Sequence, residues 1–120
     1  MQEFDIAAAR RYHRERAERE RARREEDRLI WLQRARQAVQ ELAPQHPEVQ
    51  RVYLFGSLTQ AGRFSRRSDI DIALVCDTLA AESAFWRALE SALQRDVDVR
   101  PLTGAVAEAV AHTGELLYAR

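Results

Sequence analysis

The chain has 120 residues, of which 46% are hydrophobic, so it is large enough for one domain with a modest core. Its 19 basic residues, all arginine, balance 19 acidic ones, and a net charge of zero does not demand a nucleic-acid partner. No apolar run has transmembrane length, the charged N-terminus is unlike a signal peptide, and a single cysteine, Cys76, excludes an internal disulfide. We therefore expect a protein of the reducing cytoplasm that makes no membrane contact.

Residues 1–43 contain no glycine or proline and are rich in Ala, Arg, Glu and Gln, which predicts a long helix. Nearly every residue from 10 to 28 is Arg or Glu, a pattern typical of a solvated, charged helix surface. The alternative is a docking arm that binds a partner protein or a second copy of the chain, forming a homo-oligomer.

The second half of this helix carries an apolar stripe at helical spacing, which predicts packing on the rest of the molecule. The stripe consists of Leu29, Leu32, Ala35 or Arg36, Val39 and Leu42. Pro44 and Pro47 then end the helix, because proline cannot continue it. We accordingly divide the chain into a helical segment, residues 1–43, and a domain formed by residues 44–120.

A buried strand that stops abruptly is predicted next. Val52–Phe55 are four large apolar residues in a row, as in a strand buried on both faces. Gly56 lets the backbone turn sharply and lets a ligand come close, and Ser57 adds a hydroxyl and a helix start. Leu58–Ser68, rich in Gly, Ser and Arg, should form an exposed loop.

Asp69–Val75 is predicted to be a second strand, in which alternation places Asp69 and Asp71 on one face. Two carboxylates about 4 Å apart at an effective dielectric near 20 repel each other by roughly 4 kcal/mol. A divalent cation would offset this repulsion, and the free N–H groups of the Gly56 turn would suit a polyphosphate. The stretch from Gly56 to Asp71 therefore indicates a site for a nucleoside triphosphate with Mg²⁺.

The remaining chain supplies one more helix, one more strand and a helical tail. Asp77 and Thr78 can cap a helix over Leu79–Arg95, in which Trp86 is expected to pack in the core and not to stack on a nucleobase. Asp96–Arg100 alternates as a third strand. Residues 104–120 should form one or two short helices, with Val106, Val110 and Leu117 facing the core.

Two short motifs carry a resemblance to a known family. Phe55-Gly56-Ser57 and Ser68-Asp69-Ile70-Asp71 resemble the signature of the minimal nucleotidyltransferases, small relatives of the DNA polymerase β superfamily. Eleven residues separate Ser57 from Asp69, one more than in the usual form. The resemblance covers residues 30–120 and implies an α+β fold, polymerase-β-like, with a small mixed sheet flanked by helices. Here the long N-terminal helix precedes it.

The resemblance also implies a third carboxylate on the later strand. Asp98 is the expected residue, and Asp96 is the alternative. Asp69, Asp71 and Asp98 would then hold two Mg²⁺ ions and form the catalytic centre.

The nucleotide would be bound by Gly56 and Ser57, through the backbone N–H groups and the serine hydroxyl. Arg63, Arg66 and Arg67 would either contact the triphosphate or only solubilise the loop.

Members of this family are commonly paired with a HEPN-domain ribonuclease toxin, and some are antitoxins that transfer AMP to a tyrosine of that toxin. The resemblance therefore implies an Mg²⁺-dependent nucleotidyltransferase that uses ATP to AMPylate a hydroxyl of a partner toxin. The alternative is a non-catalytic antitoxin that binds its partner through the N-terminal helix. A third reading, modification of a small molecule such as an antibiotic, is disfavoured by the short chain.

Overall fold

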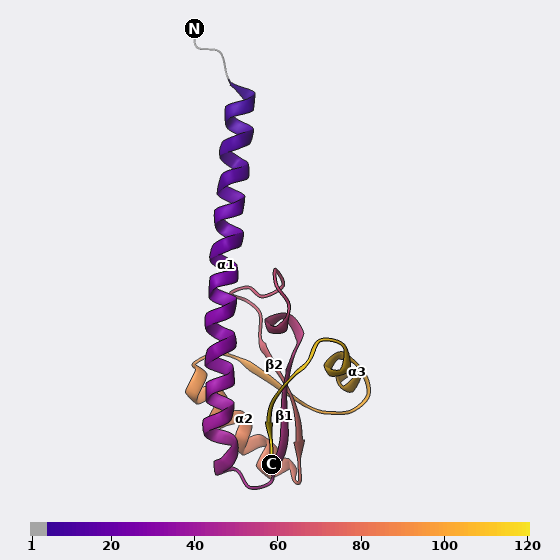
Figure 1. Cartoon of the computed structure of the whole chain (residues 1–120). Coiled ribbons are helices and arrows are strands. Elements are labelled where there is room, and N and C mark those ends of the chain that lie inside the picture. Colours follow the sequence, from indigo (N-terminus) through magenta and orange to yellow (C-terminus); the bar gives the residue numbers. More distant parts are fainter. Residues whose placement is uncertain (1–4) are drawn as a thin grey trace.

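A four-stranded mixed sheet carries helices on both of its faces (Figure 1). The computed structural model describes residues 5–120. In chain order the elements are α1 (Ile6–Leu42), η1 (Ala43–Gln45), β1 (Val49–Phe55), η2 (Gly56–Thr59), β2 (Ile70–Cys76), α2 (Leu79–Leu93), β3 (Val97–Pro101), α3 (Gly104–Thr113) and β4 (Glu115–Ala119). The predicted combination of a small mixed sheet, flanking helices and a long N-terminal helix is confirmed.

The strands lie in the order β3-β2-β1-β4. β1 runs antiparallel to β2 and to β4, whereas β2 and β3 are parallel. A parallel pair needs a crossover connection, and α2 provides it. As a result the C-terminal end of β1 lies beside the N-terminal ends of β2 and β3, at one end of the sheet.

The prediction for the C-terminal tail is wrong in its second half. α3 forms as a helix, but Glu115–Ala119 is the strand β4, which pairs with β1 and not with a neighbour in sequence. Gly114 ends α3, and Leu117 then points into the core. Arg36 of α1 ties this strand to the helix layer, because its Nε donates to Glu115 Oε2 at 2.8 Å. Such pairing depends on a partner far away in the chain, which a local pattern does not reveal.

α1 is one continuous helix whose two halves differ in environment. It starts at Asp5, whose side chain accepts from the Ala8 N–H at 3.0 Å. Its second half packs on the sheet through Leu32, Ala35, Ala38 and Val39, whereas the first half projects into solvent (Figure 1). Leu29 was expected in the packed stripe but is 51% exposed, whereas the neighbouring Arg28 faces the domain and reaches the Leu58 carbonyl. The predicted helical residues 1–4 lie outside the described part.

Despite its length, α1 is a polar helix. Between residues 5 and 120 we find no helix that is both long and apolar enough to cross a bilayer.

The core lies between the sheet and the layer formed by α1 and α2. Val52 and Leu54 of β1 are fully buried on this side, together with Phe85 and Leu89 of α2. Tyr53 and Phe55 point to the other face and are only half-buried, so the expectation of a strand buried on both faces is wrong for these two positions. α3 covers that second face only in part, and this leaves room for polar side chains there.

Two details of α2 agree with the sequence prediction. Thr78 caps the helix by accepting from the Ala81 N–H at 3.2 Å. Trp86 packs against the core, and its Nε1 donates to the Val97 carbonyl at 2.6 Å. An indole held in this way joins α2 to β3 and is not free to stack on a base.

Candidate functional site

The parallel pairing of β2 and β3 places Asp71 directly beside Asp98. The two residues are partners in the register, so their side chains leave the same face of the sheet. This is the face opposite the core, because Ile70 and Ile72 on either side of Asp71 are buried against the other layer. The geometry therefore brings together the two strands that were expected to supply carboxylates.

Asp69 lies just before β2 and is exposed. It stays close enough to act on Asp71 through its charge. Asp96, the alternative third carboxylate, also precedes its strand, and its backbone carbonyl accepts from the Ile70 N–H at 3.2 Å. The charges that act on the Asp71 carboxyl are those of Asp98 and Asp69, opposed by Arg100.

The environment of Asp71 disfavours its ionised form. Burial, followed by repulsion from Asp98 and then from Asp69, raises the pKa of Asp71 to about 6. Arg100 opposes these effects. A carboxyl group with such a pKa at the edge of a sheet is typical of a functional site.

Gly56 faces the Asp71 carboxylate closely. Its φ of +77° lies in the left-handed region, which glycine adopts without strain. A Cβ at this position would overlap Asp71 Oδ2 and lie 3.0 Å from Asp71 Cγ. The turn between β1 and η2 therefore packs against the carboxylate, and only glycine allows this approach.

The short helix η2 holds this turn in place. Thr59 Oγ1 donates to the Gly56 carbonyl at 2.7 Å, and Leu58 is fully buried. Ser57 is half-buried, and its side chain forms no hydrogen bond with the rest of residues 5–120. The helix start predicted at Gly56-Ser57 is present, in the form of a 3₁₀ turn.

The carboxylates open onto a cavity of about 260 Å³ beneath α3. Phe55, Asp71, Asp98 and Arg100 line it from the sheet, and small residues of α3 complete it. Arg100 Nε donates to Asp98 Oδ2 at 2.9 Å. Arg100 had no predicted role, although the alternation of residues 96–100 puts it on the same strand face as Asp98 and so indicates that the two side chains can meet.

Carboxylate oxygens on adjacent strands are the hard ligands that Mg²⁺ prefers, and the absence of a side chain at Gly56 leaves the Asp71 carboxylate unobstructed from the β1 turn. Asp69, Asp71 and Asp98 therefore suit a divalent cation by their chemistry. Over residues 5–120, however, no three acidic, histidine or cysteine side chains converge into a ready-made cluster. Asp98 is instead held by Arg100, in keeping with the repulsion among the three carboxylates.

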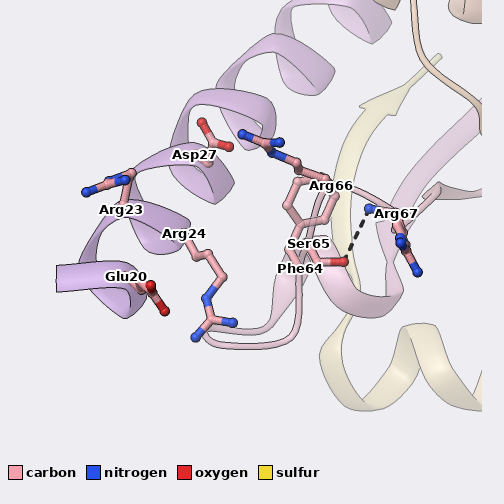
Figure 2. Close-up of a pocket in the computed structure, with 8 residues that line it drawn as sticks. All are labelled: Glu20, Arg23, Arg24, Asp27, Phe64, Ser65, Arg66 and Arg67. Atoms are coloured by element: carbon pink, nitrogen blue, oxygen red, sulfur yellow. Dashed lines mark hydrogen bonds between the residues drawn. The ribbon is translucent and has the colours of Figure 1, made fainter. Parts of the chain in front are cut away.

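The loop after η2 is less exposed than expected, and its arginines lie elsewhere. Phe64 is buried at 5% exposure and packs against Arg95, whose guanidinium stands 4.5 Å from the ring centre. Arg66 and Arg67 line a second, larger cavity on the α1 side (Figure 2). Arg63 is exposed and lines neither cavity. The structure thus separates these arginines from the carboxylate site, which the sequence could not show.

Comparisons with known proteins agree with this geometry. Residues 37–120 match the family model described as Polymerase beta, Nucleotidyltransferase. The chain is 44% identical over 62 residues to the protein adenylyltransferase MntA of Shewanella oneidensis, and it covers 44% of that relative and therefore less than half of its length.

Solved structures of toxin–antitoxin complexes are similar as well. A chain of a toxin–antitoxin crystal structure with AMP-PNP is 36% identical, with a TM-score of 0.59 over 71% of this chain and 73% of that one. A chain of the complex between tri-AMPylated Shewanella oneidensis HEPN toxin and its MNT antitoxin is 31% identical, with a TM-score of 0.55 over 74% of this chain and 73% of that one. The motifs, the site geometry and these similarities all point to one family.

Proposed function

The chain belongs to the polymerase β nucleotidyltransferase family, and on this premise we propose that it transfers AMP from ATP to a hydroxyl of a HEPN-domain toxin. The observation that carries the proposal is the pairing of Asp71 with Asp98 beside the Gly56 turn. A protein that only binds a partner has no need to hold repelling carboxylates at one edge of its sheet.

The similar proteins support the donor and the acceptor. One relative is named a protein adenylyltransferase, one similar structure contains AMP-PNP, and another contains an AMPylated HEPN toxin with its antitoxin. We extend these properties to the present chain as a proposal, which includes neutralisation of the toxin by its modification.

Asp69, Asp71 and Asp98 would hold two Mg²⁺ ions, which when bound neutralise phosphate charge and lower the pKa of the acceptor hydroxyl. Gly56 lets the triphosphate approach the backbone, and the Ser57 hydroxyl would donate to a phosphate oxygen.

The acceptor oxygen would attack the α-phosphorus and form the new P–O bond, while the bond to pyrophosphate breaks and pyrophosphate leaves. Asp98 would accept the proton of the acceptor hydroxyl.

The test is to incubate the chain with labelled ATP, Mg²⁺ and a HEPN-domain toxin. We expect label on the toxin, and a loss of about 100-fold or more in Asp71→Asn and in Asp98→Asn. Asp96→Asn, two residues before Asp98 and just ahead of β3, is the matched control and should keep most of the activity. Transfer that persists in Asp71→Asn would refute the proposal, and equal losses in the Asp96 and Asp98 variants would refute the assignment of Asp98.

A non-catalytic antitoxin remains the second candidate, because the first half of α1 contributes no residue to the core and is available to a partner. Under this function Asp71→Asn would neutralise the toxin as well as the wild type does. Neutralisation would then depend on α1 alone.

A further inference from the structure

A cavity of about 410 Å³ lies between α1 and the loop that precedes β2 (Figure 2). Four arginines line it: Arg23 and Arg24 from α1, and Arg66 and Arg67 from the loop. Figure 2 shows Arg24 reaching from the helix toward the loop and Arg66 reaching from the loop toward the helix. Two segments far apart in sequence thus present guanidinium groups to one space.

The loop is fixed in this position by Arg95. Its guanidinium lies between the rings of Trp31 on α1 and Phe64 on the loop, 4.7 and 4.5 Å from their centres. The same group donates to the carbonyls of Ser65 at 2.8 Å and Ser68 at 2.8 Å. The backbone that carries Arg66 and Arg67 is therefore tied to α1, and their positions are set before any ligand arrives.

Positive side chains outnumber negative ones in this cleft. No hydrogen bond or ion pair of residues 5–120 engages the guanidinium groups of Arg23, Arg24, Arg66 or Arg67. Two carboxylates also line the cleft, but Glu20 pairs with Arg16 at 3.3 Å, and Asp27 acts on the cation of Arg95. Four arginines face two carboxylates around this cleft, so it carries a net positive charge that an anion would reduce.

This cleft is separate from the carboxylate site. The two cavities share no lining residue: α1 and the loop line one, whereas the sheet and α3 line the other. A ligand of the arginine cleft would therefore not occupy the space between Asp71 and α3.

We propose that the cleft between α1 and residues 64–67 is a second, anionic-ligand site that binds phosphate groups. Guanidinium groups pair with phosphate oxygens in a bidentate manner, and one phosphate can accept from several arginines at once, whereas a carboxylate offers only two oxygens. The phosphate belongs to a free polyphosphate or to the backbone of RNA, which share this chemistry. The proposal does not depend on nucleotidyl transfer.

The first probe is inorganic tripolyphosphate, titrated calorimetrically into the full chain without Mg²⁺. We expect Arg24→Gln with Arg66→Gln to weaken binding by about tenfold or more. The matched control is Arg14→Gln with Arg63→Gln, which removes the same charge from the same helix and loop outside the cleft. This control should weaken binding by less than about twofold. Equal losses in the two double variants would overturn the proposal.

A labelled single-stranded RNA of about 20 nucleotides distinguishes the two sources. If the backbone of RNA is the ligand, the cleft variant should bind it more weakly and lose about two units of salt-dependence slope. If only tripolyphosphate responds to the variant, the ligand is a free polyphosphate. Polyglutamate that binds as tightly as tripolyphosphate, with the same loss in the variant, would overturn the assignment to phosphate.

Folding and the carboxylate site are checked in the same variants. The two cleft side chains make no structural hydrogen bond among the described residues, so the circular dichroism spectrum should be unchanged. Stabilisation by Mg²⁺ with AMP-PNP should also persist, because the two sites share no residue. Failure of this stabilisation in the wild type would count against the proposed transfer alone, whereas the tripolyphosphate result decides the cleft.

Discussion

Asp71 experiences burial and two neighbouring negative charges, which raise its pKa from the ordinary 3.8 to about 6. The folded state thus binds this proton more tightly than the unfolded chain does. The resulting contribution to stability is complete below about pH 4 and is lost as the pH rises through 6. In the presence of EDTA, Asp71→Asn should therefore gain stability relative to the wild type as the pH rises from about 4 to 6, and keep this advantage above pH 6, because asparagine has no such charge.

Thermal unfolding of both proteins across this pH range measures the effect. A difference in melting temperature that does not grow with pH would contradict the raised pKa. Added Mg²⁺ should stabilise the wild type at about pH 7.5 and much less so below pH 6, since a proton competes with the cation for the carboxylate. Asp71→Asn should respond to Mg²⁺ weakly at either pH.

Gly56 has a conformation and a neighbour that exclude a side chain. Gly56→Ala would strain the backbone at φ +77° by about 1–2 kcal/mol and displace the Asp71 carboxylate. We expect a loss of nucleotidyl transfer of about 100-fold. Gly62→Ala is a matched control, because its φ of +80° gives the same strain but no atom lies within 4 Å of the added Cβ.

Chemical denaturation and the transfer assay together separate the two effects. Both variants should lose similar unfolding free energy, and only Gly56→Ala should lose activity. If Gly62→Ala is equally inactive, backbone strain alone explains the loss, and the close approach to Asp71 has no special role.

At the scale of elements, features that depend on neighbouring residues were predicted from the sequence, whereas features that depend on long-range contacts were not. The Thr78 cap, the Gly56 turn and the alternation around Asp71 depend on residues within a few positions, and the structure contains all three. Asp98 was expected from the resemblance to the family, and the structure places it beside Asp71. The hydrogen bond from Arg100 to Asp98 could also have been predicted, because strand alternation puts the two residues on one face.

Features that depend on distant partners escaped prediction. β4 is a strand because β1 offers it an edge, and Phe64 is buried because Arg95 and Trp31 come together around it. Leu29 is exposed, whereas the neighbouring Arg28 faces the domain and reaches the Leu58 carbonyl. In each case the local sequence allows more than one environment, and the tertiary contact decides.

Arg95, just after the end of α2, anchors the loop between η2 and β2. Arg95→Lys keeps a charge but loses the planar group that stacks on two rings and donates to several carbonyls. We expect a loss of about 1–3 kcal/mol in unfolding free energy. Trypsin should also cleave faster after Arg66 and Arg67. Arg87→Lys, at an exposed site of α2, is the control and should change neither.

Amide hydrogen exchange of residues 62–68 gives a direct view of the same loop. Faster exchange confined to this segment in Arg95→Lys would agree with its role as an anchor. If exchange is unchanged while stability falls, Arg95 would act through the α1–α2 packing and not through the loop.

The whole molecule combines a compact domain with a helix that extends well beyond it (Figure 1). The core begins at Leu32, and the first tie between α1 and the site region is Arg28, whose guanidinium donates to the Leu58 carbonyl at 2.9 Å. Glu25 holds Arg28 in turn through contacts of 2.6–3.2 Å. The described part of α1 before Glu20 therefore makes no hydrogen bond or core contact with the domain.

Deletion of residues 1–19 should leave the unfolding free energy within about 1 kcal/mol of the wild type, because no core residue is lost. Deletion of residues 1–28 is the matched comparison and should destabilise by about 1–3 kcal/mol, since it removes the charged hydrogen bond from Arg28 to η2. Urea denaturation at two protein concentrations measures both. If the shorter deletion destabilises strongly and only at high concentration, the projecting helix pairs with a second copy of the chain. If it keeps stability and AMP transfer but abolishes toxin neutralisation, the helix is the surface that holds the partner, and modification alone does not silence the toxin.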